Sequence, residues 1–231
     1  MSEQNASQVP ETREPPSAGA GASGPTFETA QGISWLQEGL QLVLKNPVIW
    51  LAISANVVIV FFVLGFIPWI GHLAANILAP TFAAGAFIGC RALTRGEDIK
   101  IEHLFAGFQD KTPDLLKLGL VTVVGGLLIN LSAGPSVFHT FFVLVFAAAV
   151  AGVVWAAPAL VMFRSQDPVD AVKASINACD KNRVPFAVYG GLLVAVLLIA
   201  GLIPFGLGYI VVLPVVIASF YAAYEDVFET A

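Results

Sequence analysis

Six long apolar segments constrain the fold of this chain more than any other feature of its sequence. They cover residues 48–67, 70–90, 115–132, 139–163, 185–203 and 207–224. A helix of about 20 apolar residues is long enough to cross the roughly 30 Å hydrocarbon layer of a membrane. Charged residues make up only 12% of the chain, about half of what soluble domains contain. We therefore predict an all-α, polytopic transmembrane helical bundle with six spans.

The basic residues are distributed unevenly between the connections. All 11 Lys and Arg residues lie in the N-terminal tail, in the long connections after the second and fourth segments, or at the adjoining helix ends. The three short connections contain no Lys or Arg. Because cytoplasmic loops carry the excess of basic residues in membrane proteins, we expect both termini and the two long connections to be cytoplasmic.

The first 31 residues differ in composition from the rest of the chain. They are rich in Pro, Ala, Gly and Ser and contain almost no large apolar residue. Such a segment cannot bury enough apolar surface to offset its ordering entropy. It also lacks the basic and apolar regions of a secretory signal peptide. We predict a retained, disordered cytoplasmic tail over residues 1–31, a membrane domain over residues 32–226 and a short cytoplasmic end over residues 227–231.

Each pair of apolar segments follows a short amphipathic stretch, at residues 33–44, 101–108 and 169–179. These stretches are too short to span a membrane and suit helices that lie in the inner interface. Parts of the first and last units also match: Lys45-Asn46-Pro47 corresponds to Lys181-Asn182-Arg183, and Pro68 corresponds to Pro204 at the same offset. We predict three parallel repeats, each an amphipathic helix followed by a hairpin, over residues 32–95, 96–164 and 165–226.

Polar residues and prolines inside the apolar segments are the candidates for a functional site. The asparagines can line a polar path, although such side chains more often hydrogen-bond between helices. The prolines should kink their helices, and the freed carbonyls can form hinges or pockets, although kinks for shape alone are more frequent. The candidate polar residues are Asn56, Asn76 and Asn130, and the candidate kinks are Pro80, Pro158 and Pro214.

Several features of enzymes and nucleic-acid binders are missing from the sequence. The net charge is −5 and no basic stripe is present, which argues against binding to nucleic acid. No nucleophile–base pair, phosphate-binding glycine loop or carboxylate pair is visible, and the two cysteines have no metal-site spacing. We therefore expect no cofactor, no metal and no enzymatic activity. Five aromatic residues have positions typical of interfacial anchors: Trp35, Trp50, Trp69, Tyr221 and Tyr224.

Several short motifs resemble those of a known group of membrane proteins. They are Lys45-Asn46-Pro47, Arg91-Ala92-Leu93, Leu104-Phe105-Ala106-Gly107-Phe108 and the run Asp-Pro-Val-Asp-Ala-Val-Lys-Ala-Ser at residues 167–175. Together they resemble uncharacterised bacterial inner-membrane proteins of six spans, related to the membrane domain of some glycerophosphodiester phosphodiesterases. The resemblance covers about residues 32–226. It implies the architecture and a location in the bacterial inner membrane, but no activity, because the phosphodiesterase domain itself is absent here.

Two functions follow as hypotheses. The first is a non-enzymatic membrane protein that acts through contacts with membrane lipids, a protein partner or a second copy of itself. The alternative is a transporter or channel for a neutral or weakly polar solute, which would use the asparagines and the proline kinks. Proton-coupled carriers usually keep ionisable groups inside the membrane. Here the apolar segments contain no Asp, Glu or Arg, and Lys117 stands at the inner end of the third segment.

Overall fold

The computed structural model describes residues 25–109, 111–131, 150, 152, 154–204 and 207–229. The elements that it describes are all helical, which confirms the all-α prediction. They are α1 (Pro25–Lys45), α2 (Pro47–Gly65), α3 (Ile70–Thr94), the 3-10 helix η1 (Ile101–Phe108), α4 (Thr112–Leu131), α6 (Ala157–Arg164), α7 (Pro168–Lys181), α8 (Arg183–Gly201), α9 (Leu207–Tyr224) and the π-helical turn η3 (Glu225–Glu229).

Four helices in the described part are long and apolar enough to cross a membrane. They are α2, α3, α8 and the helix formed by α9 and η3 together. These four coincide with the predicted first, second, fifth and sixth segments, and they make the chain a multi-span helical membrane protein. The third segment coincides with α4. Helix α4 is not among these four, and most of the fourth segment lies outside the described residues. The described part therefore shows four candidate spans rather than six.

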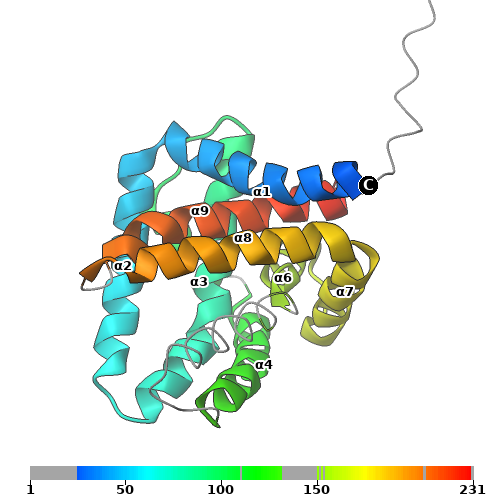
Figure 1. Cartoon of the computed structure of the whole chain (residues 1–231). Helices are drawn as coiled ribbons and strands as arrows, with labels where there is room; N and C mark the ends of the chain where they lie inside the picture. Colours follow the sequence, from blue (N-terminus) through cyan, green and yellow to red (C-terminus); the bar gives the residue numbers. More distant parts are fainter. Residues whose placement is uncertain are drawn as a thin grey trace, which may run out of the picture.

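The helices form two groups that cross each other (Figure 1). Helices α1, α8 and α9 lie side by side, whereas α2, α3 and α4 run across them. Each amphipathic segment packs against an earlier or distant helix: α1 against α9 and α8, η1 against α3, and α7 against α6. Three parallel repeats are not shown by the residues that the structure describes.

The amphipathic stretches are helical where the sequence predicts them. Helix η1 occupies residues 101–108, and α7 begins at Pro168 with Asp167 as its N-cap. The Asp167 carboxylate accepts a hydrogen bond from the Val169 backbone N–H at 2.9 Å, which satisfies one of the free donors of the first turn. Helix α1, however, begins at Pro25. Residues 25–31 are therefore helical rather than part of a disordered tail.

The core is rich in aromatic side chains that the sequence analysis assigned to the membrane surface. Trp35 and Trp50 are fully buried, as are Tyr221 and Tyr224, so for these four residues the prediction of interfacial anchors is wrong. For Trp35 the reason is the packing of α1 on α8, which places its ring 4.8 Å from the ring of Phe186. Of the five predicted anchors, only Trp69 is exposed.

Candidate functional site

The predicted polar residues Asn56 and Asn76 do not meet in the structure. The Asn56 amide donates to the Ala52 carbonyl at 2.8 Å, and the Asn76 amide donates to the His72 carbonyl at the same distance. Both hydrogen bonds run back along the residue's own helix, so the two amides are not joined to each other. The side chain of Asn130 lies outside the described part of the chain.

Asn76 lies at a helix–helix contact. The Thr122 hydroxyl of α4 donates to the Asn76 carbonyl oxygen at 2.6 Å. A Cβ atom added to Gly126 would stand 2.8 Å from the Asn76 side-chain oxygen, so a glycine lets α4 approach this side chain closely. This geometry is typical of polar packing between membrane helices.

The three prolines have two different positions. Pro80 and Pro214 are buried inside α3 and α9, where the sequence predicts them. Pro158 instead lies in the first turn of α6, directly after a bend at residues 155–156. A proline costs little at the start of a helix, because its missing N–H would have no helical partner there.

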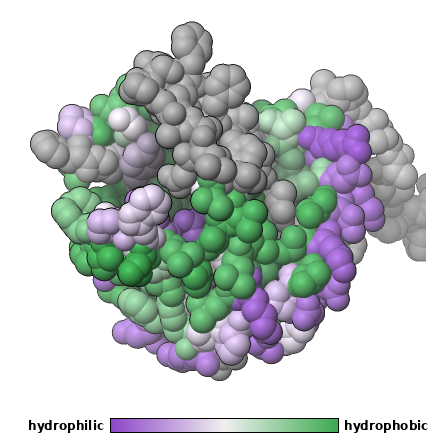
Figure 2. Space-filling model, turned by 90° about the horizontal axis from the view of Figure 1, so that it is seen from below, coloured by the Kyte–Doolittle hydropathy of each residue, from purple (hydrophilic) through white to green (hydrophobic). Residues whose placement is uncertain are grey.

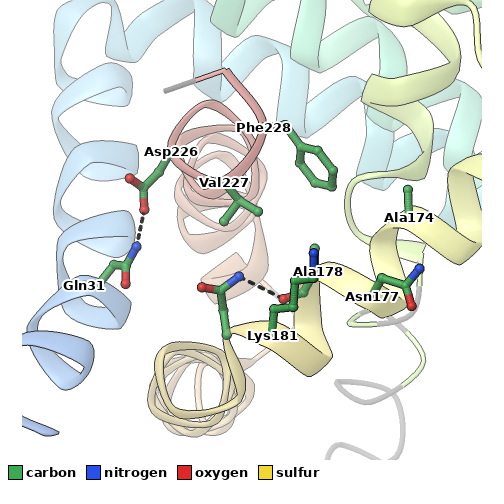
Figure 3. Close-up of a pocket in the computed structure, with 9 residues that line it drawn as sticks. Gln31, Ala174, Asn177, Ala178, Lys181, Asp226, Val227 and Phe228 are labelled. Atoms are coloured by element: carbon green, nitrogen blue, oxygen red, sulfur yellow. Dashed lines mark hydrogen bonds between the residues drawn. The ribbon is translucent and has the colours of Figure 1, made fainter. Parts of the chain in front are cut away.

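The structure forms a cavity at a place that the sequence analysis did not select. It has a volume of about 560 Å³ and lies between the start of α1, the end of α7 and the C-terminal turn η3 (Figure 3). It combines polar side chains with apolar ones, and its lining residues are Gln31, Ala174, Asn177, Ala178, Lys181, Asn182, Asp226, Val227 and Phe228. We refer to it below as the end cavity.

One wall of the end cavity joins the two ends of the described chain. A single carboxylate oxygen of Asp226 accepts a hydrogen bond from the Gln31 amide at 2.7 Å and another from the Trp35 indole at 2.8 Å. The residues that these bonds connect are 195 and 191 positions apart in the sequence. Because Trp35 is fully buried, its indole N–H needs this acceptor to avoid an unsatisfied donor.

The opposite wall comes from α7 and the residue that follows it. The Asn182 amide donates to the Ala178 carbonyl at 2.9 Å, which closes the last turn of α7. Lys181 ends this helix and is exposed. Burial raises the pKa of the neighbouring Cys179 to about 11, so this thiol stays protonated and weakly nucleophilic at neutral pH.

Two further carboxyl groups, those of Glu38 and Glu225, lie near Asp226. The pKa of Glu38 on α1 is raised above its usual value, first by burial and then by the nearby carboxylates of Asp226 and Glu225. A hydrogen bond with Ser34 acts in the opposite direction. The end cavity therefore has an acidic side, formed by α1 and η3, and a basic side at Lys181.

The lining of the end cavity offers hydrogen-bonding and charged groups. These are amides, one amine and one carboxylate, with no nucleophile–base pair among them. Within the described residues, no group of three or more His, Cys, Asp or Glu side chains could hold a metal ion. The arrangement is suited to recognition by hydrogen bonds and charge.

Sequence reasoning missed the end cavity because its residues come from three distant segments. Its one visible signal was the Lys181-Asn182 pair, which the repeat comparison had already matched with Lys45-Asn46. Nothing in the sequence pairs Gln31 with Asp226, since that contact depends on how α1 packs along α9.

Comparison with known proteins identifies a distant relative. The chain is 26% identical over 190 residues to a protein of Burkholderia thailandensis that is named as a probable inner membrane protein. The alignment covers 69% of this chain and 70% of that protein. No family model matches the chain, and no solved structure matches it. The comparisons thus identify a distant homologue that is named as a probable inner membrane protein, and they assign no family.

Proposed function

We propose that this chain is a non-enzymatic integral protein of the bacterial inner membrane that acts by binding membrane lipid. The observation that carries the proposal is the end cavity, a recess with charged, amide and apolar groups in its lining, in a molecule whose long helices expose apolar side chains. The name of the distant relative supports the location. The cavity lining supports binding, because it offers hydrogen-bonding and charged groups of both signs.

The apolar surface supports contact with lipid along the helices. Large side chains such as Phe62, Ile199 and Val211 are more than half exposed on helices that are long enough to span the bilayer. Figure 2 shows apolar residues gathered over the middle of one face, with hydrophilic residues along one edge. A soluble monomer rarely exposes so much contiguous apolar surface, whereas a membrane protein requires it.

In this proposal the chain has six spans with both termini cytoplasmic, and contacts between distant segments support a shared side for several helix ends. The Lys45 amine donates to the Leu93 carbonyl at 3.3 Å, and the hydroxyls of Thr94 and Tyr221 lie 3.4 Å apart. The charge distribution assigns all of these helix ends to the cytoplasm. Together with the end cavity they form what we call the inner end of the molecule. The uncharged connections at residues 66–69 and 202–204 form the outer end.

The packing of the amphipathic segments supports the proposal of three repeats. Segments η1 and α7 each lie on the second helix of the preceding apolar pair, since α6 is the described end of the fourth segment. Helix α1 lies on α9, the second helix of the last pair. This order is what a closed ring of three units would produce.

Two of these contacts also occupy matching positions. A methyl group at Gly85 of α3 would collide with the backbone of Leu104 in η1, and one at Gly39 of α1 would collide with the backbone of Ser219 in α9. Gly85 stands five residues after Pro80, and Ser219 stands five residues after Pro214. The correspondence supports a common ancestry of the first and last units.

Native mass spectrometry tests the proposed function. The full-length protein is extracted with its own lipids into mild detergent, and the expected result is a reproducible set of retained phospholipids. A stable monomer that retains no lipid in repeated preparations would overturn the proposal. In that case the protein would have to act without bound lipid.

Cysteine labelling tests the proposed topology. With Cys90 and Cys179 replaced by alanine, single cysteines are introduced by Trp69→Cys at the outer end and Gly96→Cys in the connection after α3. A membrane-impermeant thiol reagent applied to intact spheroplasts should label only the first. Labelling of the second from outside would contradict a cytoplasmic inner end.

A further inference from the structure

The end cavity presents opposite charges from two different elements. Figure 3 shows Asp226 and Gln31 together on one side, with Lys181 and Asn177 on the α7 side. Apolar groups complete the lining, which includes Val227 and the small side chains of α7. A cavity of about 560 Å³ can enclose a ligand of several polar groups and part of an attached apolar chain.

We propose that the end cavity binds the headgroup of a zwitterionic phospholipid, with its phosphate at Lys181 and its primary ammonium group at Asp226. The chemistry that is recognised is a phosphodiester joined by a short link to an ammonium group, as in phosphoethanolamine. This inference rests on the proposed function and names the class of lipid that the protein would bind. It requires both charged walls, so it makes separate predictions for each of them.

Lys181 is the basic residue available for the phosphate. In the described part of α7 and the start of α8, Lys173 pairs with Asp170 at 3.1 Å and Arg183 pairs with Asp180. Lys181 belongs to none of the ion pairs among the described residues and lines the cavity instead. An ammonium group offers three donors, and hydrogen bonds from a cation to a phosphate are about twice as strong as neutral ones.

The opposite wall is suited to the ammonium group. Two neutral donors, Gln31 and Trp35, help to hold the Asp226 carboxylate in place. Its negative charge also acts on Glu38, whose pKa it helps to raise. A carboxylate that is fixed in this way offers a primary ammonium group an acceptor without a further loss of side-chain entropy.

The mixed lining favours a lipid over a small soluble ligand. Ala174, Ala178 and Val227 stand beside the charged groups, and a soluble phosphoethanolamine would leave these apolar surfaces without a partner. The cavity also lies at the inner end, where the proposed topology places lipid headgroups.

Lipid competition with charge variants tests the proposal. Full-length protein in detergent is exposed to equal amounts of phosphatidylethanolamine and phosphatidylglycerol, and bound lipid is measured by native mass spectrometry. Lys181→Gln removes the basic charge. Asp226→Asn removes the acidic charge while leaving an oxygen that can accept from Gln31 and Trp35. Lys173→Gln is the matched control, since Lys173 lies on the same helix but outside the cavity lining.

The expected result is selective retention of phosphatidylethanolamine, reduced about tenfold by each cavity variant and unchanged by the control, because each lost interaction involves a charged hydrogen bond. Lipid that is retained equally by wild type and both variants would overturn the headgroup site and leave the proposed function intact. Loss of all bound lipid from the wild type would overturn the proposed function itself.

A soluble competitor distinguishes the two sources of this headgroup chemistry. Glycerophosphoethanolamine has the phosphodiester and the ammonium group but no acyl chains. It should displace the lipid only at concentrations at least tenfold above those of the lipid, because it cannot cover the apolar lining. Binding as tight as that of the lipid would overturn the assignment to a membrane ligand.

Discussion

The inner and outer ends of the molecule differ in how they hold the helices together. At the inner end, Trp35 is 0% exposed and its indole donates to Asp226 at 2.8 Å. At the outer end, Trp69 is 89% exposed. The close approaches of glycine differ in kind: a Cβ added to Gly39 of α1 would stand 2.5 Å from the Ser219 backbone nitrogen of the distant helix α9. At the outer end, Gly71 and Gly208 approach only the backbone of the preceding helix, and a Cβ added to Gly65 would meet nothing within 4 Å.

The difference shows which contacts fix the fold in a protein of this kind. The outer turns connect adjacent helices, and their apolar side chains can be covered by lipid. The inner end joins helices that are far apart in the sequence, so its contacts determine how α1 sits on α8 and α9. The same residue change is therefore made at each end, and its effects on stability at the two ends are compared.

The largest effect should come from truncating the two tryptophans. Trp35→Ala removes a fully buried ring and leaves a cavity, which costs about 3–5 kcal/mol of unfolding free energy in protein cores. Trp69→Ala should change stability by less than about 0.5 kcal/mol, as is usual for exposed positions. Thermal unfolding of the purified proteins in mild detergent, followed by circular dichroism, gives the two midpoints. Equal losses at both positions would contradict a fold held together at the inner end.

A smaller loss is expected from Gly39→Ala. The added methyl group would meet the backbone of Ser219, which cannot move as a side-chain end can, and overpacking of this type costs about 1–3 kcal/mol. Gly65→Ala has open space around it and serves as the matched control. Limited proteolysis should cut α1 faster in the Gly39 variant, because this helix would separate from α9. Unchanged protection of α1 would show that its packing on α9 does not hold it in place.

Asn56→Leu separates the lipid-binding hypothesis from the solute-path hypothesis. The Asn56 amide bonds within its own helix, so its removal should change stability by less than about 1 kcal/mol and leave solute uptake unchanged. Uptake of neutral and weakly polar solutes into proteoliposomes is the measurement. A specific uptake activity that this substitution abolishes would restore the transporter alternative.

The sequence predicted the local structure better than the packing. The apolar lengths predicted α2, α3, α8 and α9, because spanning a membrane sets helix length whatever the neighbours are. The cap at Asp167 is local in the same sense, since it joins residues only two positions apart. Such features follow from local geometry alone.

Long-range contacts could not be predicted in this way. Trp35 has a position typical of an interfacial anchor, but the packing of α1 on α8 covers its ring with Phe186. The pairing of Gln31 with Asp226 depends on the same packing, and so does the end cavity. Charge distribution assigned these residues to one side of the membrane, but only the structure shows which of them touch.

The smallest expected effect is a pH dependence at the inner end. Because burial, Asp226 and Glu225 raise the pKa of Glu38, the folded state favours its protonated form. The resulting stabilisation is present in full below the usual carboxyl pKa and is lost as the pH rises through the raised value. The unfolding midpoint of wild type relative to Glu38→Gln should therefore fall as the pH rises above the usual carboxyl pKa. Glu97→Gln, at an exposed position after α3, controls for the loss of one carboxylate. The opposite result is a midpoint of wild type that rises relative to that of Glu38→Gln as the pH increases. It would mean that the carboxylates of α1 and η3 do not repel each other where these two elements meet.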